Sequence, residues 1–459
     1  MQSNRNRYTF GLGTVGRDMV YSLVSMYLMF YLTDILNLDT NVLWWVTTIM
    51  LCARIFDAFN DPVMGVIVDN THTRWGRFKP WILSGILLSG VFTILLFTDF
   101  GLSGTAYIIS FAIFYLLWGI TYTMHDISYW SMLPSLSKDQ REREKIGSVA
   151  RICANVGLFA IVSLIVPVTE YLGTLCGSKQ KGYFVLAVIL VAIMIVFQCF
   201  TLFGVKESKE SRHRTTQHTT LREMGRVIFK NDQLLVAAIS MSLFMIGYMT
   251  TTGFGLYYFK YAYGDEGMYS VFALILGVSQ LTALSVFPMF SKRFSRKKLY
   301  TGSTVLVVAG YLLFFFAPTD TMLVIGIAGI LIFVGQAFIQ LMMLMFLTDS
   351  VEYGEWKFGK RNDSVTLSLQ SFINKMGGAI ASGITGVIVI ISGMKTAQTA
   401  ADMTESGLII LKAAMLIFPL FCILIGFLIY RSKYILDEKM YQKIVTELAE
   451  CNPAAGSEK

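Results

Sequence analysis

The feature that most constrains this chain is a series of apolar runs, each long enough to cross a membrane. A bilayer core of about 30 Å is spanned by roughly 20 helical residues. Scanning the 459 residues for such runs between polar breaks predicts twelve membrane-spanning helices. The predicted spans are 8–34, 41–68, 80–98, 104–133, 148–175, 182–204, 234–260, 268–290, 298–317, 322–350, 365–392 and 407–431. The chain is therefore predicted to be an all-α polytopic membrane protein.

Composition supports this class, because 54% of the residues are apolar and only 15% are charged. A soluble surface needs about 25–35% charged residues to stay dispersed. The low charge also argues against a disordered chain and against one that wraps nucleic acid, so no nucleic-acid partner is expected. The six cysteines show no metal-binding spacing and are interpreted as small buried apolar residues.

The longest polar stretch, 205–233, divides the predicted spans into six plus six. Transporters built from two similar helical bundles have this layout. The predicted domains are an N-terminal bundle over 1–204, a cytoplasmic middle loop over 205–233, a C-terminal bundle over 234–431 and a cytoplasmic tail over 432–459.

The distribution of basic residues predicts the orientation of the spans. Of the 38 Lys and Arg residues, 29 lie in the N-terminus, the C-terminal tail and the loops on the same side, against four in the opposite loops. Cytoplasmic loops carry the excess of basic residues, so both termini are predicted to be cytoplasmic. The net charge of +8 then reflects topology. A basic patch for a binding partner is the less favoured alternative.

Charged residues inside the predicted spans mark candidate sites, because each costs at least ~2.5–3.5 kcal/mol to insert at mid-bilayer. In the second span, Arg54, Asp57 and Asp61 are spaced to share one helical face, with Asn60 beside them. The alternative is an ion-pair cluster that only fixes helix packing. Three charges and an amide exceed what one salt bridge needs, which favours a binding role.

The fourth span places Thr123, Asp126 and Trp130 on one face by the same spacing. An aromatic ring can stack on the C–H face of a sugar while a carboxylate accepts hydrogen bonds from its hydroxyl groups. A lone Trp is more often a packing or membrane-interface residue. The neighbouring Asp126 favours the sugar interpretation.

Isolated charges in other spans extend this pattern. Span 1 carries Arg17 and Asp18, span 5 carries Arg151, and span 11 carries Lys375. Acids and bases balance, which predicts a mutually neutralising interior cluster. Lys375 lies about ten residues into its span, too deep for simple snorkelling, and is predicted to point across a cavity toward the acids of the first half.

Five segments together resemble the glycoside–pentoside–hexuronide:cation symporter family of the major facilitator superfamily. They are Asp57-Ala-Phe-Asn60-Asp61-Pro62, Arg74-Trp75-Gly76-Arg77-Phe78-Lys79-Pro80-Trp81, Asp126-Ile-Ser-Tyr129-Trp130-Ser131, Arg141-Glu-Arg143-Glu and Asp349-Ser-Val-Glu352-Tyr353-Gly354-Glu355. The resemblance covers the whole chain. It implies two six-helix bundles, transport by alternating access and a location in a bacterial inner membrane.

The resemblance also implies roles for individual residues. The implied cation-binding residues are Asp57, Asn60, Asp61 and Thr123. The implied sugar-binding residues are Asp18, Asp126, Trp130 and Arg151, together with Lys375, Gln370 and Ser371 of span 11.

The predicted function is therefore symport of a sugar or glycoside with a cation by a chain that is not an enzyme and needs no cofactor. Two carboxylates, an amide and a hydroxyl favour Na⁺, with H⁺ as the alternative coupling ion. A lipid or drug carrier of the same fold is a second possibility, but it needs a more apolar cavity. A membrane enzyme is a third, but it needs a larger extramembrane loop. The expected partners are the sugar, the monovalent cation and the bilayer, and the expected working form is a monomer.

Two oppositely charged loop segments predict a gate. Arg74, Arg77 and Lys79 follow span 2, and Asp349, Glu352 and Glu355 end span 10 on the same predicted side. We expect charge pairs involving these segments to hold the cytoplasmic side shut and to break when the bundles rock. The alternative for the basic segment is anchoring to the cytoplasmic leaflet.

Overall fold

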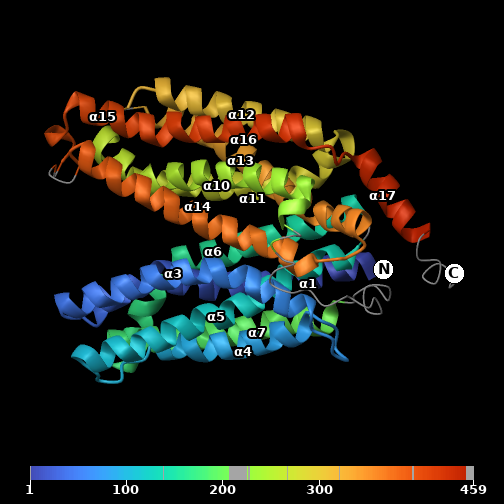
Figure 1. Cartoon of the computed structure of the whole chain (residues 1–459). Coiled ribbons are helices and arrows are strands. Elements are labelled where there is room, and N and C mark those ends of the chain that lie inside the picture. Colours follow the sequence, from blue (N-terminus) through green and yellow to red (C-terminus); the bar gives the residue numbers. More distant parts are fainter. Residues whose placement is uncertain are drawn as a thin grey trace. The chain divides into compact units, whose positions relative to one another are not determined.

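A computed structural model describes residues 2–137, 139–205, 225, 228–265, 267–319, 321–394, 397 and 399–450. The regular secondary structure in these ranges is helical, which confirms the predicted all-α class (Figure 1). Residues 206–224 and 226–227 of the predicted middle loop lie outside the described residues, as do residues 451–459 of the predicted tail.

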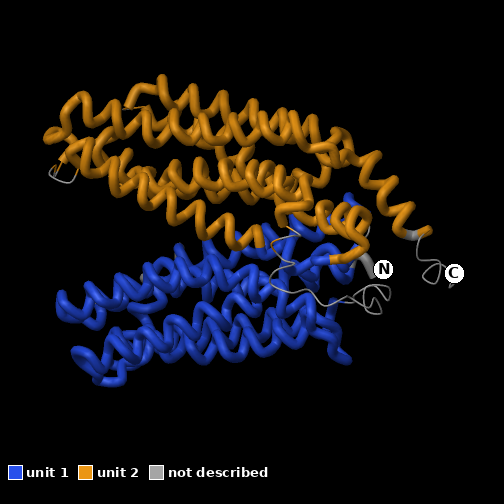
Figure 2. The backbone as a smooth tube through the Cα atoms, viewed as in Figure 1, with its two compact units in different colours: residues 1–224, 362–368 blue, residues 225–361, 369–459 orange. Residues whose placement is uncertain are grey.

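The chain forms two compact units (Figure 2). Unit 1 comprises residues 1–224 and 362–368. Its first helix, α1 (Gln2–Ser22), continues through α2 (Leu28–Phe30) and π-helical turns to Ile35. The other helices of unit 1 are α3 (Thr40–Asp69), α4 (Lys79–Leu96), α5 (Gly104–Leu136), α6 (Gln140–Cys176) and α7 (Lys179–Cys199). A π-helical turn extends α7 to Gly204. Helix α1 packs on α6 and α7, and α5 packs on both α3 and α4.

Unit 2 comprises residues 225–361 and 369–459. Its helices are α10 (Asp232–Tyr258), extended by a π-helical turn to Tyr263, α11 (Met268–Arg293), α12 (Arg296–Phe316), α13 (Met322–Phe358), most of α14 (Asp363–Ile391), a 3₁₀ turn (Ala400–Asp402), α15 (Glu405–Lys412), a π-helical turn (Ala413–Ile417), α16 (Phe418–Lys433) and α17 (Glu438–Glu450). Helix α13 packs on α10, α11, α12 and α17, and α10 also packs on α16.

The helices coincide with the predicted spans. Among the described residues, eleven helices are long and apolar enough to cross a membrane. The first predicted span, 8–34, lies within the helical run from Gln2 to Ile35, whose N-terminal part is more polar. The total of twelve spans and the cytoplasmic termini stay predictions.

Local signals set several helix ends. The side chain of Asn231 accepts a hydrogen bond from the backbone N–H of Leu234 at 3.0 Å and caps α10. Gly177 and Gly359, with φ of 75° and 68°, end α6 and α13 in a left-handed conformation that costs a glycine little. These caps satisfy backbone groups that a helix cannot pair internally.

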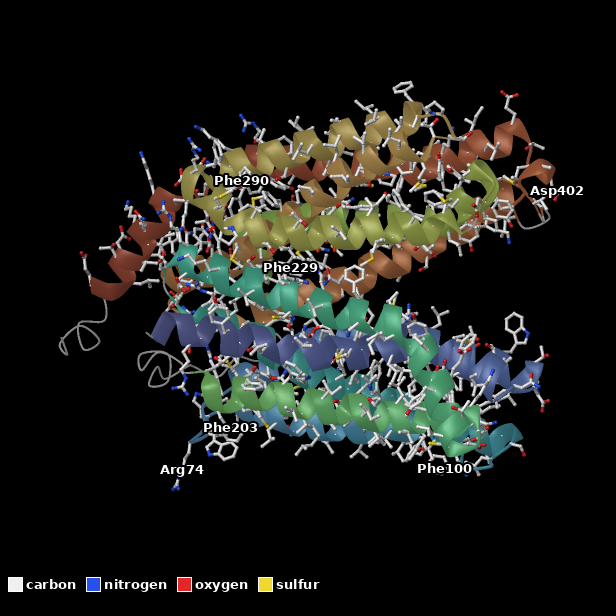
Figure 3. All side chains as sticks on the ribbon, turned by 180° about the vertical axis from the view of Figure 1, so that it is seen from behind. Arg74, Phe100, Phe203, Phe229, Phe290 and Asp402 are labelled. Carbon is white, nitrogen blue, oxygen red and sulfur yellow. The ribbon has the colours of Figure 1, made fainter. Side chains whose placement is uncertain are left out.

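Large apolar side chains remain exposed around both units. Phe203 is 76% exposed and Phe229 is 74% exposed (Figure 3). Such exposure would be costly in water but is expected of side chains that face lipid. Several charged side chains of both units are buried instead, among them Arg17, Asp61 and Asp349.

Candidate functional site

The centre of unit 1 contains one arginine that bridges two carboxylates from different helices. Arg17 Nη2 of α1 lies 2.8 Å from Asp18 Oδ2, and Arg17 Nη1 lies 3.0 Å from Asp126 Oδ1 of α5. The Arg17 side chain is 3% exposed, whereas Asp18 and Asp126 are 23% and 19% exposed. The arginine is thus sealed inside, while both carboxylates stay partly accessible. These are three of the interior charges that the sequence predicts to neutralise one another.

Trp130 lies against the same arginine. Its ring centroid is 5.2 Å from the guanidinium carbon of Arg17 and 4.9 Å from that of Arg151 on α6. Tyr129 lies 5.0 Å from the Arg17 guanidinium and stacks on Phe10 at 4.3 Å. Cations over the faces of aromatic rings are attracted by the ring quadrupole, more strongly when desolvated. The ring of Trp130, which is 7% exposed, is therefore held in one orientation.

The four residues implied for sugar binding in the first half, Asp18, Asp126, Trp130 and Arg151, thus converge around Arg17. Sequence reasoning counted Arg17 among the interior charges but did not include it in the site. Its position next to Asp18 was the available signal. The bond to Asp126, 109 residues further along the chain, depends on the packing of α1 and α5.

A second polar cluster lies between α3 and α5. Thr123 donates its hydroxyl hydrogen bond to Asp61 Oδ1 at 3.1 Å, and Asp61 is fully buried. Asp57, one helical turn earlier, packs against Gly119: a Cβ atom at Gly119 would lie 2.7 Å from Asp57 Oδ1. The amide nitrogen of Asn60 is buried and makes no hydrogen bond within the described part of the chain. Carboxylate and hydroxyl oxygens of two helices therefore lie together. The spacing on α3 predicts only that Asp57 and Asp61 share one helical face, and the inclusion of Thr123 was implied by the family resemblance.

The three remaining substrate candidates lie in unit 2. Gln370, Ser371 and Lys375 follow one another along α14, with Gln370 buried and the other two half-buried. Gly377, two residues beyond Lys375, is in close approach to Met245 of α10. The structure describes these residues within their own unit, and their role toward the clusters of unit 1 stays a prediction.

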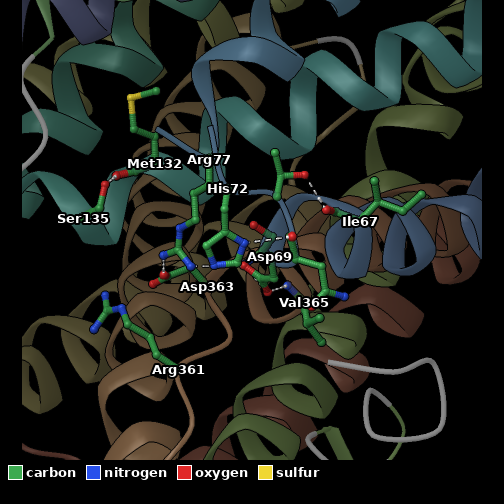
Figure 4. A network of polar contacts seen from close by, with 12 residues as sticks. Ile67, Asp69, His72, Arg77, Met132, Ser135, Arg361, Asp363 and Val365 are labelled. Atoms are coloured by element: carbon green, nitrogen blue, oxygen red, sulfur yellow. Dashed lines mark hydrogen bonds and ion pairs between the residues drawn. The ribbon is translucent and has the colours of Figure 1, made fainter. Parts of the chain in front are cut away.

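The loop after α3 takes part in a network that sequence reasoning missed (Figure 4). Asp69 accepts hydrogen bonds from the backbone N–H groups of Ser364 at 3.0 Å and Val365 at 3.0 Å, in the first turn of α14. Arg77 lies 3.6 Å from Asp69 and forms an ion pair with Asp363. Asp69 and Asp363 are both buried. Residues 362–368 belong to unit 1 because these contacts hold them there.

The other predicted gating residues also have partners within their own units. Asp349 forms an ion pair with Arg296, and Arg361 lies 3.4 Å from Glu352 and 3.0 Å from Glu355. Burial alone would lower the pKa of Arg361, but the two glutamates raise it above its usual value, so the guanidinium stays charged.

The basic side of the predicted gate is divided between two environments. Lys79 donates to the carbonyl oxygens of Leu202 and Val205 at 2.8 and 2.9 Å, and Arg74 is exposed (Figure 3). Direct pairing between the basic and acidic segments stays a prediction. The sequence alone did not identify four of the residues that pair with the predicted gating residues, namely Asp69, Asp363, Arg296 and Arg361.

The amino-acid sequence of this chain is similar to known proteins over most of its length. The chain matches the family described as MFS/sugar transport protein over residues 9–438. It is 34% identical to the raffinose carrier protein of Pediococcus pentosaceus over 96% of this chain and 71% of that protein. It is 32% identical to the lactose permease of Lactobacillus delbrueckii subsp. bulgaricus over 96% of this chain and 72% of that permease.

A solved structure shows the same fold. The major facilitator transporter FucP, crystallised in the outward conformation, aligns with a TM-score of 0.67 at 12% identity, covering 95% of this chain and 99% of that one. These relatives are transporters, which confirms the prediction that the chain is not an enzyme. They also confirm the multi-pass membrane class. The chain belongs to the MFS/sugar transport protein family, as its resemblance to the glycoside–pentoside–hexuronide:cation symporters implied.

Proposed function

We propose that this protein is a sodium-coupled symporter of a sugar or glycoside. The observation that carries the proposal is the position of α5 in both polar clusters of unit 1. Its Thr123 bonds Asp61, and its Asp126, three residues later, pairs with Arg17. The cation cluster and the cluster around Arg17 are therefore one helical turn apart on α5. A cation that binds at the first cluster can act on the second through this helix.

The cluster of Asp57, Asn60, Asp61 and Thr123 supports a cation as the coupling partner. Two carboxylates one turn apart repel each other unless a cation or a proton lies between them. Hard cations prefer oxygen ligands, and this cluster supplies carboxylate, amide and hydroxyl oxygens without water. A proton-only carrier would need a single titrating acid. We therefore favour Na⁺, with H⁺ competing at low pH.

The cluster around Arg17 supports a polyhydroxylated substrate. Asp18 and Asp126 each keep part of their carboxylate accessible while Arg17 balances their charge. Carboxylates accept charge-assisted hydrogen bonds from sugar hydroxyl groups, and an aromatic ring such as that of Trp130 offers apolar contact. The names of the relatives, raffinose carrier and lactose permease, support an oligosaccharide or glycoside.

Uptake into proteoliposomes tests the proposal directly. A panel of radiolabelled glycosides is offered under an inward Na⁺ gradient, an inward H⁺ gradient, or a membrane potential alone. We expect at least one glycoside to accumulate under the Na⁺ gradient, and the accumulation to rise with an inside-negative potential. Equal accumulation under the H⁺ gradient in Na⁺-free buffer would contradict sodium coupling. Failure of every glycoside would contradict the substrate class.

Gly119→Ala should weaken cation binding. The added Cβ would lie 2.7 Å from Asp57 Oδ1, so either the carboxylate or the α3–α5 packing has to move. Overpacking costs about 1–3 kcal/mol, so the Na⁺ concentration for half-maximal stimulation of glycoside binding should rise roughly tenfold. Titration of glycoside binding with NaCl measures this concentration.

A matched glycine on another helix controls for the change in helix propensity. Gly383 lies in α14 with no atom within 4 Å of its potential Cβ. Gly383→Ala should leave the Na⁺ dependence unchanged. If Gly119→Ala also leaves it unchanged, the Asp57 carboxylate has no part in cation binding.

Asp69→Asn should loosen the first turn of α14. We propose that the contacts of Asp69 and Arg77 with this turn break and re-form during each transport cycle. Asn cannot supply the negative charge that favours a helix N-terminus, and it has one acceptor oxygen where Asp has two. Hydrogen–deuterium exchange in peptides covering 362–368 should become faster, and the transport rate should change.

Asp139→Asn serves as the control, because Asp139 also accepts a backbone hydrogen bond, from Arg141 at the start of α6. It should leave exchange in 362–368 as in the unmodified protein. Unchanged exchange in Asp69→Asn would show that the turn is held by other contacts.

A further inference from the structure

Unit 2 contains a cavity that none of the predicted sugar, cation or gating residues lines. Its volume is about 290 Å³ and it lies between the start of α12 and the end of α16. Its walls are formed by Lys297, Thr301, Phe427, Tyr430, Arg431 and Tyr434. Two cations, one threonine hydroxyl group and three aromatic rings, two of which are tyrosines, therefore line one small space.

The inner wall is a rigid aromatic layer. Tyr430 and Tyr434 are each 3% exposed and stack on one another with ring centroids 4.9 Å apart. Tyr300 meets Tyr430 edge-on at 4.5 Å, and Phe346 lies 4.9 Å from Tyr434. Because each ring has neighbours, the shape of the cavity does not depend on a ligand to form it.

The outer wall is basic. Lys297 and Arg431 are both exposed, and Arg431 forms no ion pair within the described residues. Lys297 lies 4.0 Å from Asp437, but both side chains are largely solvated, and such a pair contributes little. Two other acids lie near the lining tyrosines, and both contact Arg296. Glu438 accepts a hydrogen bond from the backbone N–H of Arg296 at 2.6 Å, and Asp349 forms an ion pair with the Arg296 side chain. The cations at the mouth are thus only weakly neutralised.

Exposed apolar side chains lead away from the cavity along the same two helices. Val305, one turn beyond Thr301 on α12, is 61% exposed, and Leu428, one turn before Arg431 on α16, is 60% exposed. Ile425, one turn further along α16, is 45% exposed. A soluble anion would make no contact with this apolar surface, whereas the acyl chains of a lipid would cover it.

We infer that this cavity binds the headgroup of an anionic phospholipid. The phosphodiester lies between Lys297 and Arg431, the glycerol backbone contacts Thr301 and Phe427, and the acyl chains follow Val305 and Leu428. Basic pockets between membrane helices select anionic headgroups by charge, and aromatic rings commonly lie at headgroup level. The inference uses unit 2 alone and is independent of the coupling ion and of the sugar.

Native mass spectrometry of the detergent-solubilised protein tests the inference. Phosphatidylglycerol and phosphatidylcholine with identical acyl chains are titrated separately. The unmodified protein should retain phosphatidylglycerol in preference, and Lys297→Gln with Arg431→Gln should reduce its retention on the order of tenfold, because each basic residue contributes to headgroup attraction. Retention of phosphatidylcholine should not change.

Two further variants keep the test specific. Lys298→Gln with Lys433→Gln removes the same charge from exposed residues at the same end of unit 2 that do not line the cavity, and it should retain the lipid. Lys297→Arg with Arg431→Lys keeps the charge and should also retain it, which separates lipid loss from misfolding.

Three results would overturn the inference. They are equal retention of the two lipids by the unmodified protein, equal loss in the control pair, and displacement of phosphatidylglycerol by millimolar inorganic phosphate or glycerol 3-phosphate. The last result would assign the cavity to a soluble phosphate instead of a lipid.

Discussion

Asp61→Asn should abolish concentrative sugar uptake while sparing sugar exchange. The substitution keeps the shape of the side chain and the partner of the Thr123 hydroxyl but removes one negative charge from a fully buried position. Without that charge, the side chains at positions 57 and 61 no longer repel each other. A cation that binds between them then no longer relieves a repulsion, so its binding is weaker. The variant should bind sugar without responding to Na⁺.

The size of the effect follows from linkage. Two ligands that raise each other's binding affinity do so by the same factor. If the cation no longer raises the affinity for sugar, the sugar no longer raises the affinity for the cation. A potential of 100 mV drives one inward charge with about 2.3 kcal/mol, which concentrates a co-transported sugar roughly 50-fold. In Asp61→Asn this ratio should fall to about one.

The measurement compares accumulation with exchange in the same proteoliposomes. Active uptake under a Na⁺ gradient gives the first quantity, and release of preloaded labelled sugar into unlabelled sugar gives the second. Asp99→Asn is the matched control, since Asp99 is an exposed acid outside the cluster. Sodium-driven accumulation that persists in Asp61→Asn would assign the cluster a purely structural role.

Arg17→Gln should lower sugar affinity by at least tenfold and reduce thermal stability. Arg17 is the buried cation between Asp18 and Asp126, and its removal leaves two carboxylates facing each other. Breaking a fully buried pair costs about 3–5 kcal/mol. Because both carboxylates are about one-fifth exposed, we expect a smaller stability loss, of roughly 2–3 kcal/mol.

A double-mutant cycle isolates this interaction. Arg17→Gln combined with Asp126→Asn removes the uncompensated charge, so the double variant should regain part of the thermal stability that the single variant loses. Sugar affinity should stay low, because Asp126 no longer supplies a charged acceptor. Arg17→Lys keeps the charge without the two-pronged geometry of the guanidinium and should be intermediate.

Arg7→Gln provides a control on the same helix. Arg7 pairs with Glu142 at 2.8 Å, so this variant also removes an ion pair of α1. It should leave sugar affinity unchanged in isothermal titration. Normal sugar binding by Arg17→Gln would place the sugar away from Asp18 and Asp126.

The sequence by itself determined the helical class, the approximate spans and most of the polar positions in unit 1. The reason is energetic. Apolar runs of about 20 residues are stable across a bilayer only as helices, and a charge inside such a run is too costly to be incidental. Helical spacing then placed Asp57 and Asp61 on one face and Asp126 and Trp130 on another.

Only the tertiary structure decided which side chains on different helices contact each other. Arg17 bridges to Asp126 because α1 packs near α5, and Gly119 matters because α5 presents its bare backbone to Asp57. Spacing along a helix says which side chains share a face, but it does not say which helix that face meets. Asp69 and Ser364 are 295 residues apart, and nothing local to either predicts their hydrogen bond. Partners that distant are selected by the packing of whole helices, which depends on all the side chains between them.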